Sequence, residues 1–120
     1  MQSFGRTLLL VDDPALIEGY REHHRAVWPQ VTARLREVGI TQMRIYLLGR
    51  RLFMYMEAAD GFDPATDFAR INDDTRSQEW DQLMRTMQER VPEAADGEWW
   101  AAMEQVFDLS SEPEVEPDDR

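Results

Sequence analysis

The sequence predicts an α+β domain in which a ferredoxin-like antiparallel four-stranded sheet carries helices on one face. Three observations support this fold class. Apolar or alternating runs at residues 6–11, 43–48, 52–57 and 103–109 are typical of strands. One long amphipathic pattern follows the first run, and further helical patterns separate the third run from the fourth. Short connections can join strands and helices in this order into such a sheet.

The first predicted strand, residues 6–11, leads directly into a helix start. Asp13 suits the N-cap because its carboxylate can accept hydrogen bonds from free N–H groups of the first turn, and Pro14 suits the first helical position. The apolar residues that follow fall on one stripe as far as Val38, at about 100° per residue. Gly39 then ends the predicted helix.

Pro29 lies inside this helical pattern and allows two interpretations. A proline there cannot donate a hydrogen bond to the carbonyl of Arg25, and it usually kinks a helix. A kink just after His24 could open a gap between the helix and the sheet. Pro29 is equally consistent with the end of one helix and the start of another.

Residues 43–48 and 52–57 are predicted to form a β-hairpin, because Gly49-Arg50-Arg51 is a tight connection in which Gly49 can take the first central position. Alternate side chains of the hairpin form two sets. The first set is apolar: Met43, Ile45, Leu47, Leu52, Met54 and Met56. The second set is mixed and rich in aromatic residues: Arg44, Tyr46, Phe53, Tyr55 and Glu57. Helices on one face would leave the second set in water, so either it lines a pocket or a second subunit covers it. The sequence therefore predicts a homodimer that pairs through the sheets.

Two more helices are expected after the hairpin. Asp63-Pro64 repeats the helix-start signal and opens a short helix to about residue 71. Asp74 or Thr75 can cap another helix over residues 76–90, which carries one apolar stripe.

The composition fits one domain with a core, since the chain has 120 residues and 42% of them are hydrophobic. We expect residues 1–109 to form this domain and residues 110–120 to be an acidic disordered tail. The sequence has no run of eighteen apolar residues and no signal-peptide pattern, which favours a cytoplasmic protein.

The residue composition excludes several kinds of chemistry and of partner. The chain has no cysteine and no lysine, which excludes disulfides, thiolate nucleophiles, Schiff bases and the lysine of a P-loop. The net charge of −11 argues against nucleic acid and anionic membranes as partners. A neutral or weakly charged small molecule fits best.

Both histidines lie in the long helical segment. His24 is near the centre of the apolar stripe, His23 points about 100° away from it, and Tyr20 lies one turn before His24 on the same face. His24 can be a core residue hydrogen-bonded to a carboxylate or to the backbone. Alternatively, it can form a general acid–base pair with Tyr20 at the edge of a cavity. Adjacent histidines on a helix cannot both face one ion, so no metal site is predicted.

The tryptophans also allow two interpretations. Trp80 can stack on the apolar face of a pyranose ring, or it can anchor the core with its indole N–H hydrogen-bonded at the edge. Trp99 and Trp100 follow a loop that contains a glycine, where they can rim a cavity or pack against a partner chain.

Several short motifs together resemble the L-rhamnose mutarotase family. They are Tyr20-x-x-x-His24, Trp28-Pro29, Ile45-Tyr46, Gln78-Glu79-Trp80 and Met103-Glu104-x-Val106-Phe107. The resemblance runs from about residue 6 to residue 109. Residues 51–57 and 97–100 look more like the branch of this family associated with L-fucose breakdown.

The resemblance implies a dimeric α+β barrel that interconverts the α and β anomers of a 6-deoxy-L-sugar, L-fucose or L-rhamnose, without a cofactor. It implies that His24 is the proton donor, that Tyr20 binds sugar and that Trp80 is the first of two adjacent sugar-binding tryptophans. Met43 stands where the rhamnose pattern has a tyrosine, and Asp81 where it has the second tryptophan. These departures bear on which sugar is used more than on the reaction. Trp99 is a further candidate for sugar binding.

Two rival functions stay open at this point. One is a dimeric α+β barrel monooxygenase or isomerase that acts on an aromatic compound and uses the same aromatic residues. The other is a non-catalytic small-ligand-binding domain in which His24 only packs.

Overall fold

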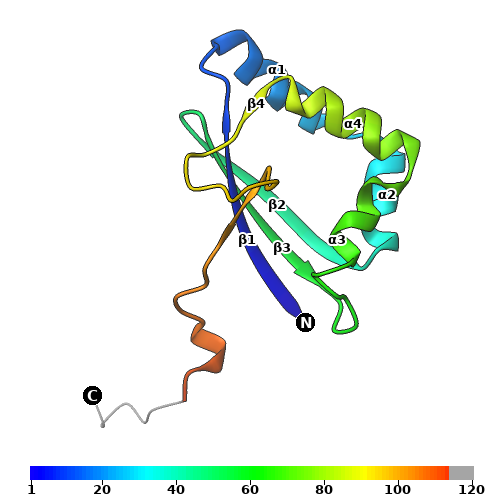
Figure 1. The fold of residues 1–120 in the computed structure, drawn as a ribbon, viewed down its shortest axis with the longest axis vertical. Helices are drawn as coiled ribbons and strands as arrows, with labels where there is room; N and C mark the ends of the chain where they lie inside the picture. Colours follow the sequence, from blue (N-terminus) through cyan, green and yellow to red (C-terminus); the bar gives the residue numbers. More distant parts are fainter. Residues whose placement is uncertain (114–120) are drawn as a thin grey trace.

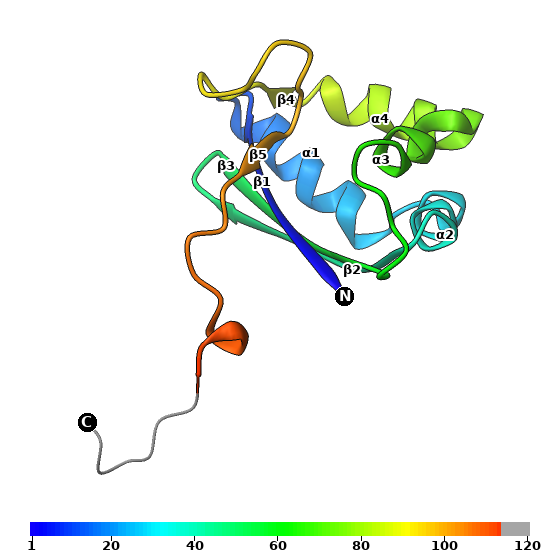
Figure 2. The same cartoon turned by 60° about the horizontal axis from the view of Figure 1, so that its bottom comes forward.

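One antiparallel sheet organises the protein, whose computed structural model describes residues 1–113. The five strands are β1 (Gln2–Leu10), β2 (Ile40–Leu48), β3 (Arg51–Ala58), β4 (Gln88–Glu89) and β5 (Ala101–Met103). Their order is β2-β3-β1-β4, and β5 also pairs with β1. The helices lie on one side of this sheet (Figures 1 and 2). The predicted α+β, ferredoxin-like class is confirmed.

The fourth strand of the expected sheet is divided into β4 and β5, and both pieces pair with the same edge of β1. β4 pairs with Leu9 and Leu10, whereas β5 pairs with residues 5–7. The loop between them, residues 90–100, therefore leaves the sheet and returns to it. The prediction of a strand over residues 103–109 was wrong, because the sheet pairing ends at Met103 and the chain then runs away from the domain (Figure 1).

The hairpin of β2 and β3 forms as predicted. Leu48 is opposite Arg51, so Gly49 and Arg50 are the two turn residues. Gly49 has a φ of +60°, which glycine adopts without steric cost. β2 begins at Ile40, earlier than expected, and its pairing with β3 shifts register between Ile40 and Gln42.

The expected long helix is two helices, α1 (Pro14–Arg25) and α2 (Pro29–Glu37). The Asp13 carboxylate accepts a hydrogen bond from the backbone N–H of Ala15 at 2.9 Å, as the N-cap prediction requires. A proline disfavours helical geometry in the residue before it, and Trp28 is accordingly extended, with φ −57° and ψ 129°. Pro29 thus starts a second helix, and the prediction of one helix as far as Val38 was wrong.

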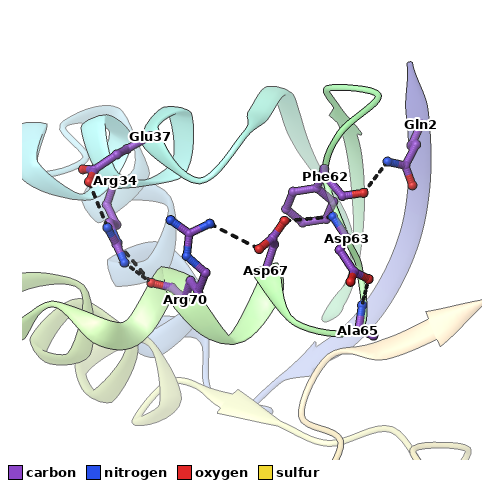
Figure 3. Close-up of polar contacts among 8 residues, drawn as sticks. All are labelled: Gln2, Arg34, Glu37, Phe62, Asp63, Ala65, Asp67 and Arg70. Carbon is purple, nitrogen blue, oxygen red and sulfur yellow. Dashed lines mark hydrogen bonds and ion pairs between the residues drawn. The ribbon is translucent and has the colours of Figure 1, made fainter.

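The short helix α3 (Asp67–Arg70) begins later than predicted and continues into the 3₁₀ turn η1 (Ile71–Asp73). The reason is a turn held by two carboxylates (Figure 3): Asp63 accepts from the N–H of Ala65, and Asp67 accepts from the N–H of Asp63. Arg34 of α2 donates to the carbonyl of Arg70 and ties the two helices together.

The last helix, α4 (Thr75–Arg85), is capped by Asp74, which accepts hydrogen bonds from the N–H groups of Arg76 and Ser77. It ends at Arg85, so the prediction of a helix as far as residue 90 was wrong. Residues 88 and 89 pair with β1 instead, and this sheet pairing satisfies backbone groups that the helix would otherwise use.

The two faces of the hairpin differ as the sequence predicts. Leu52, Met54 and Met56 are buried on the helix side of the sheet. On the outer side, Tyr46 is 55% exposed and Phe53 is 37% exposed, and their rings stack with centroids 6.1 Å apart.

Residues 109–111 form the 3₁₀ turn η2 (Leu109–Ser111) at the start of the expected disordered tail. The rest of that prediction, from residue 114 on, lies outside the described residues. Within residues 1–113, no helix is long and apolar enough to span a membrane.

Candidate active site

A cavity of about 850 Å³ lies between the helices and the inner face of the sheet. The six residues that the sequence singled out all contribute to its wall: Tyr20, His24, Met43, Trp80, Asp81 and Trp99. They come from α1, β2, α4 and the loop of residues 90–100, so residues far apart in the sequence meet at one place. The cavity is on the helix side of the sheet, and the exposed aromatic residues of the outer face do not take part in it.

His24 lies in the last turn of α1, and a hydrogen bond fixes its tautomer. Its Nδ1 is 2.8 Å from the backbone carbonyl oxygen of Tyr20. A carbonyl oxygen only accepts, so Nδ1 carries the proton and Nε2 of the neutral ring has a free lone pair. Burial lowers the pKa of His24 below 6.5; the bond to Tyr20 opposes this shift and the charge of His23 adds to it. At neutral pH His24 can therefore accept a proton at Nε2.

Tyr20 lies against this imidazole. The two rings are 4.3 Å apart between centroids, with 34° between their planes, and Tyr20 is only 4% exposed. Burial raises the pKa of Tyr20 to about 12, although a hydrogen bond from Gln88 works in the opposite direction. The phenol therefore stays protonated over the physiological range and can donate a hydrogen bond.

Trp80 forms an apolar wall beside His24. Its indole meets the His24 ring edge-on, with centroids 5.6 Å apart, and packs on Trp28 at 5.1 Å. The Arg76 guanidinium lies 3.7 Å from the centre of the Trp28 ring, which holds the start of α2 and the start of α4 together. The His23 ring lies edge-on to the same indole, with ring centroids 6.2 Å apart, but among the described residues His23 is not part of the cavity wall.

Asp81 and Trp99 are linked through Arg85. The Arg85 Nε donates to the Asp81 carboxylate at 2.9 Å, and the Arg85 guanidinium lies 4.5 Å from the centre of the Trp99 ring. Asp81 is therefore part of an ion pair at the cavity wall. Met43 contributes an apolar side chain from β2.

Arg6 and Gln88 are among the polar residues of the cavity wall that the sequence did not single out. Arg6 projects from β1 on the same side as Leu8, and its guanidinium lies 4.0 Å from the centre of the Phe68 ring. Burial lowers the pKa of Arg6, and the nearby charge of Glu98 opposes this shift. Alternation with Leu8 could have placed Arg6 inward. Gln88 was assigned to a helix, so nothing indicated that it faces the cavity.

The site thus combines an imidazole with a free lone pair, a phenol that can donate and a flat indole face, in a largely apolar cavity. Such a set suits a small polyhydroxylated ligand and proton transfer at one of its oxygens. Within residues 1–113, no three His, Asp or Glu side chains are grouped so as to hold a metal ion.

A family model described as L-rhamnose mutarotase matches residues 4–109 of this chain. The chain belongs to this family. The resemblance inferred from the motifs is confirmed. Mutarotases are isomerases that interconvert sugar anomers. The match covers the whole cavity wall, from β1 to the loop that carries Trp99.

Two relatives match this chain over nearly its full length. The chain is 40% identical over 118 residues to the L-fucose mutarotase of Xanthomonas campestris pv. campestris, covering 97% of this chain and 94% of that protein. It is 45% identical over 112 residues to a UPF0734 protein of Dictyostelium discoideum, covering 90% of each. The crystal structure of an L-rhamnose mutarotase from Formosa agariphila superposes with a TM-score of 0.68 at 17% identity, covering 91% of this chain and 99% of the other. This last likeness confirms the fold class.

Proposed function

We propose that this protein interconverts the α and β anomers of a 6-deoxy-L-sugar, with His24 as the group that transfers the proton. The observation that carries the proposal is the free Nε2 lone pair of a neutral His24 in a cavity shared with Tyr20 and Trp80. Family membership supplies the reaction. L-fucose is preferred over L-rhamnose, because an L-fucose mutarotase is 40% identical and because Met43 and Asp81 depart from the rhamnose pattern.

The proposed reaction needs no co-reactant. Nε2 of His24 takes the proton of the anomeric hydroxyl O1 and passes it to the ring oxygen, which is bonded to the same carbon. The bond between the anomeric carbon and the ring oxygen breaks and leaves the open-chain aldehyde. After the aldehyde rotates, the same steps run in reverse on its other face, and the proton returns from the ring oxygen to O1 through the imidazole.

Tyr20 and Trp80 have supporting roles in this proposal. The Tyr20 hydroxyl donates to an oxygen of the hemiacetal and stabilises the negative charge that develops there. Trp80 offers its indole face to the apolar side of the sugar ring and holds the sugar beside His24. Trp99 contributes to the same wall. The reaction already proceeds slowly in water, so orientation and modest acid–base assistance are enough.

The direct test is saturation-exchange NMR between the anomer signals of L-fucose and of L-rhamnose, with and without the protein. We expect faster exchange for both sugars, with the larger acceleration for L-fucose. If neither exchange is accelerated, the proposed function is wrong. A larger acceleration for L-rhamnose would contradict the preference alone.

We also propose that two copies pair through their outer sheet faces. Tyr46 and Phe53 support this, because they form a stacked aromatic pair that is exposed in a single chain. The exposed Met103 of strand β5 extends the apolar surface. Light scattering after size exclusion should give twice the 14.1 kDa of one chain, and Phe53→Arg should give 14.1 kDa. A native protein that runs at 14.1 kDa at micromolar concentration would contradict the pairing.

The remaining proposals concern partners. The net charge of −11 supports a free neutral monosaccharide as the ligand, with neither nucleic acid nor a membrane as partner. By analogy with the family, we also propose that the protein is cytoplasmic and that its reaction needs no cofactor.

A further inference from the structure

Gln88 is a buried polar residue that the proposed reaction does not yet use. It is 7% exposed and lies on β4, opposite Leu10. Its side-chain amide bridges two cavity residues from other elements: Nε2 is 3.3 Å from the Tyr20 hydroxyl oxygen, and Oε1 is 2.8 Å from the indole nitrogen of Trp99. Both ends of the amide are thus occupied.

The chemistry of these three groups fixes the direction of each hydrogen bond. The indole N–H of Trp99 can only donate, so it must face the carbonyl end of the Gln88 amide. The NH₂ end then faces Tyr20, and an NH₂ group can only donate. The Tyr20 oxygen is consequently the acceptor, and its own proton must point elsewhere.

We infer that Gln88, held by Trp99, is a positioning residue that directs the Tyr20 O–H toward the sugar. The inference rests on the proposed function. A phenol can both accept and donate a hydrogen bond, and its proton can rotate between several acceptors. Here Gln88 already uses the Tyr20 oxygen as an acceptor. The donor is therefore available to a hemiacetal oxygen, without reorganisation at the moment of reaction.

The same network changes the role of Trp99. Its N–H is used by Gln88, so only its ring is available to the cavity. Arg85 lies over that ring at 4.5 Å and further restricts it. Trp99 therefore acts on Tyr20 through Gln88, by fixing which end of the amide points to the phenol.

Gln88→Glu is the sharpest test, because a carboxylate accepts hydrogen bonds from both neighbours. It can still accept from Trp99, but it would also accept the Tyr20 proton and turn it away from the sugar. We expect the NMR-measured acceleration of anomer exchange to fall about tenfold, which is the typical effect of one lost hydrogen bond. In a Tyr20→Phe background the same substitution should cost less than about twofold. Gln82→Glu, the same change at an exposed position on α4, is the matched control and should leave the rate unchanged.

Gln88→Met provides a second variant of similar size, in case a buried carboxylate prevents folding. It removes the donor to Tyr20 without adding a charge, and we expect a loss of roughly threefold that also vanishes in the Tyr20→Phe background. A purely structural Gln88 would give the same fold-loss in both backgrounds. If the native protein is active and the Gln88 substitution costs the same with and without Tyr20→Phe, this inference is wrong and the proposed function stands. A native protein that accelerates neither sugar would overturn both.

Discussion

Tyr20 and Tyr55 show how one residue type serves two different purposes on the two faces of the sheet. Each phenol is hydrogen-bonded to one side chain. On the outer face, the Tyr55 hydroxyl donates to the Glu57 carboxylate at 2.7 Å, so its proton is committed to the protein, and this bond raises the pKa of Tyr55. In the cavity, Tyr20 accepts from Gln88 and keeps its proton free. The partner, a carboxylate or an amide, decides whether a tyrosine can donate to a ligand.

The faces differ in burial as well as in hydrogen bonding. The aromatic pair of the outer face, Tyr46 and Phe53, is stacked and exposed in one chain. The inner pair, Tyr20 and His24, is close-packed, and burial shifts both pKa values toward the neutral forms. Aromatic content alone therefore does not distinguish the candidate site from the outer face, whereas burial beside a titratable group does.

The largest expected difference between the faces is in stability. Leu52 is 1% exposed on the inner face of β3, and Leu48 is 84% exposed beside the hairpin turn. Leu52→Ala should lower the free energy of unfolding by about 3 kcal/mol, because it leaves a cavity in the core. Leu48→Ala should cost less than about 0.5 kcal/mol. Urea denaturation of both variants measures the difference, and similar losses would mean that the outer face is also a core.

A smaller effect is expected from removing each phenol hydroxyl. Tyr20→Phe should reduce kcat/KM for L-fucose anomer exchange about tenfold, because one hydrogen bond to the reacting sugar is lost. Tyr55→Phe should leave kcat/KM unchanged, since its hydroxyl is bonded to Glu57 outside the cavity. Anomer-exchange rates at several sugar concentrations provide the comparison. An unchanged rate in the Tyr20 variant would remove Tyr20 from the site.

The smallest expected effect concerns pH. The pKa of His24 is lowered from 6.5 by burial, and the neutral form is the one that accepts a proton. The exchange rate should thus fall to half of its plateau value only at a pH below 6.5. The same shift makes His24 lower the stability as the pH falls through 6.5 toward the folded-state pKa, because the unfolded chain binds the proton more readily. A rate profile with its midpoint above pH 6.5 would contradict the neutral, buried imidazole.

Local sequence signals predicted much of the fold and of the site. The Asp13-Pro14 helix start and the Gly49 turn each depend on neighbouring residues, and both occur as expected. Tyr20 and His24 were paired by their four-residue spacing, which a helix converts directly into contact.

The features that were missed depend on contacts between distant residues. β4 has two residues, and only its pairing with Leu9 and Leu10 makes it a strand, so a local pattern could not distinguish it from the end of α4. Gln88 lies on β4, so its place in the cavity wall was missed for the same reason. Likewise, nothing local could show that the fourth strand divides around residues 90–100, which bring Trp99 to the cavity.

Replacement of each histidine by alanine tests the central claim most directly. His23 and His24 are neighbours on α1 and both touch Trp80, but only His24 lines the cavity with its Nδ1 bonded to Tyr20. Saturation-exchange NMR on L-fucose should show that His24→Ala loses at least about a hundredfold of the acceleration, as expected for a lost acid–base group. His23→Ala should stay within about twofold of the native rate, since its imidazole takes no part in proton transfer. A His24→Ala protein that is folded and nearly as fast as the native one would contradict the account.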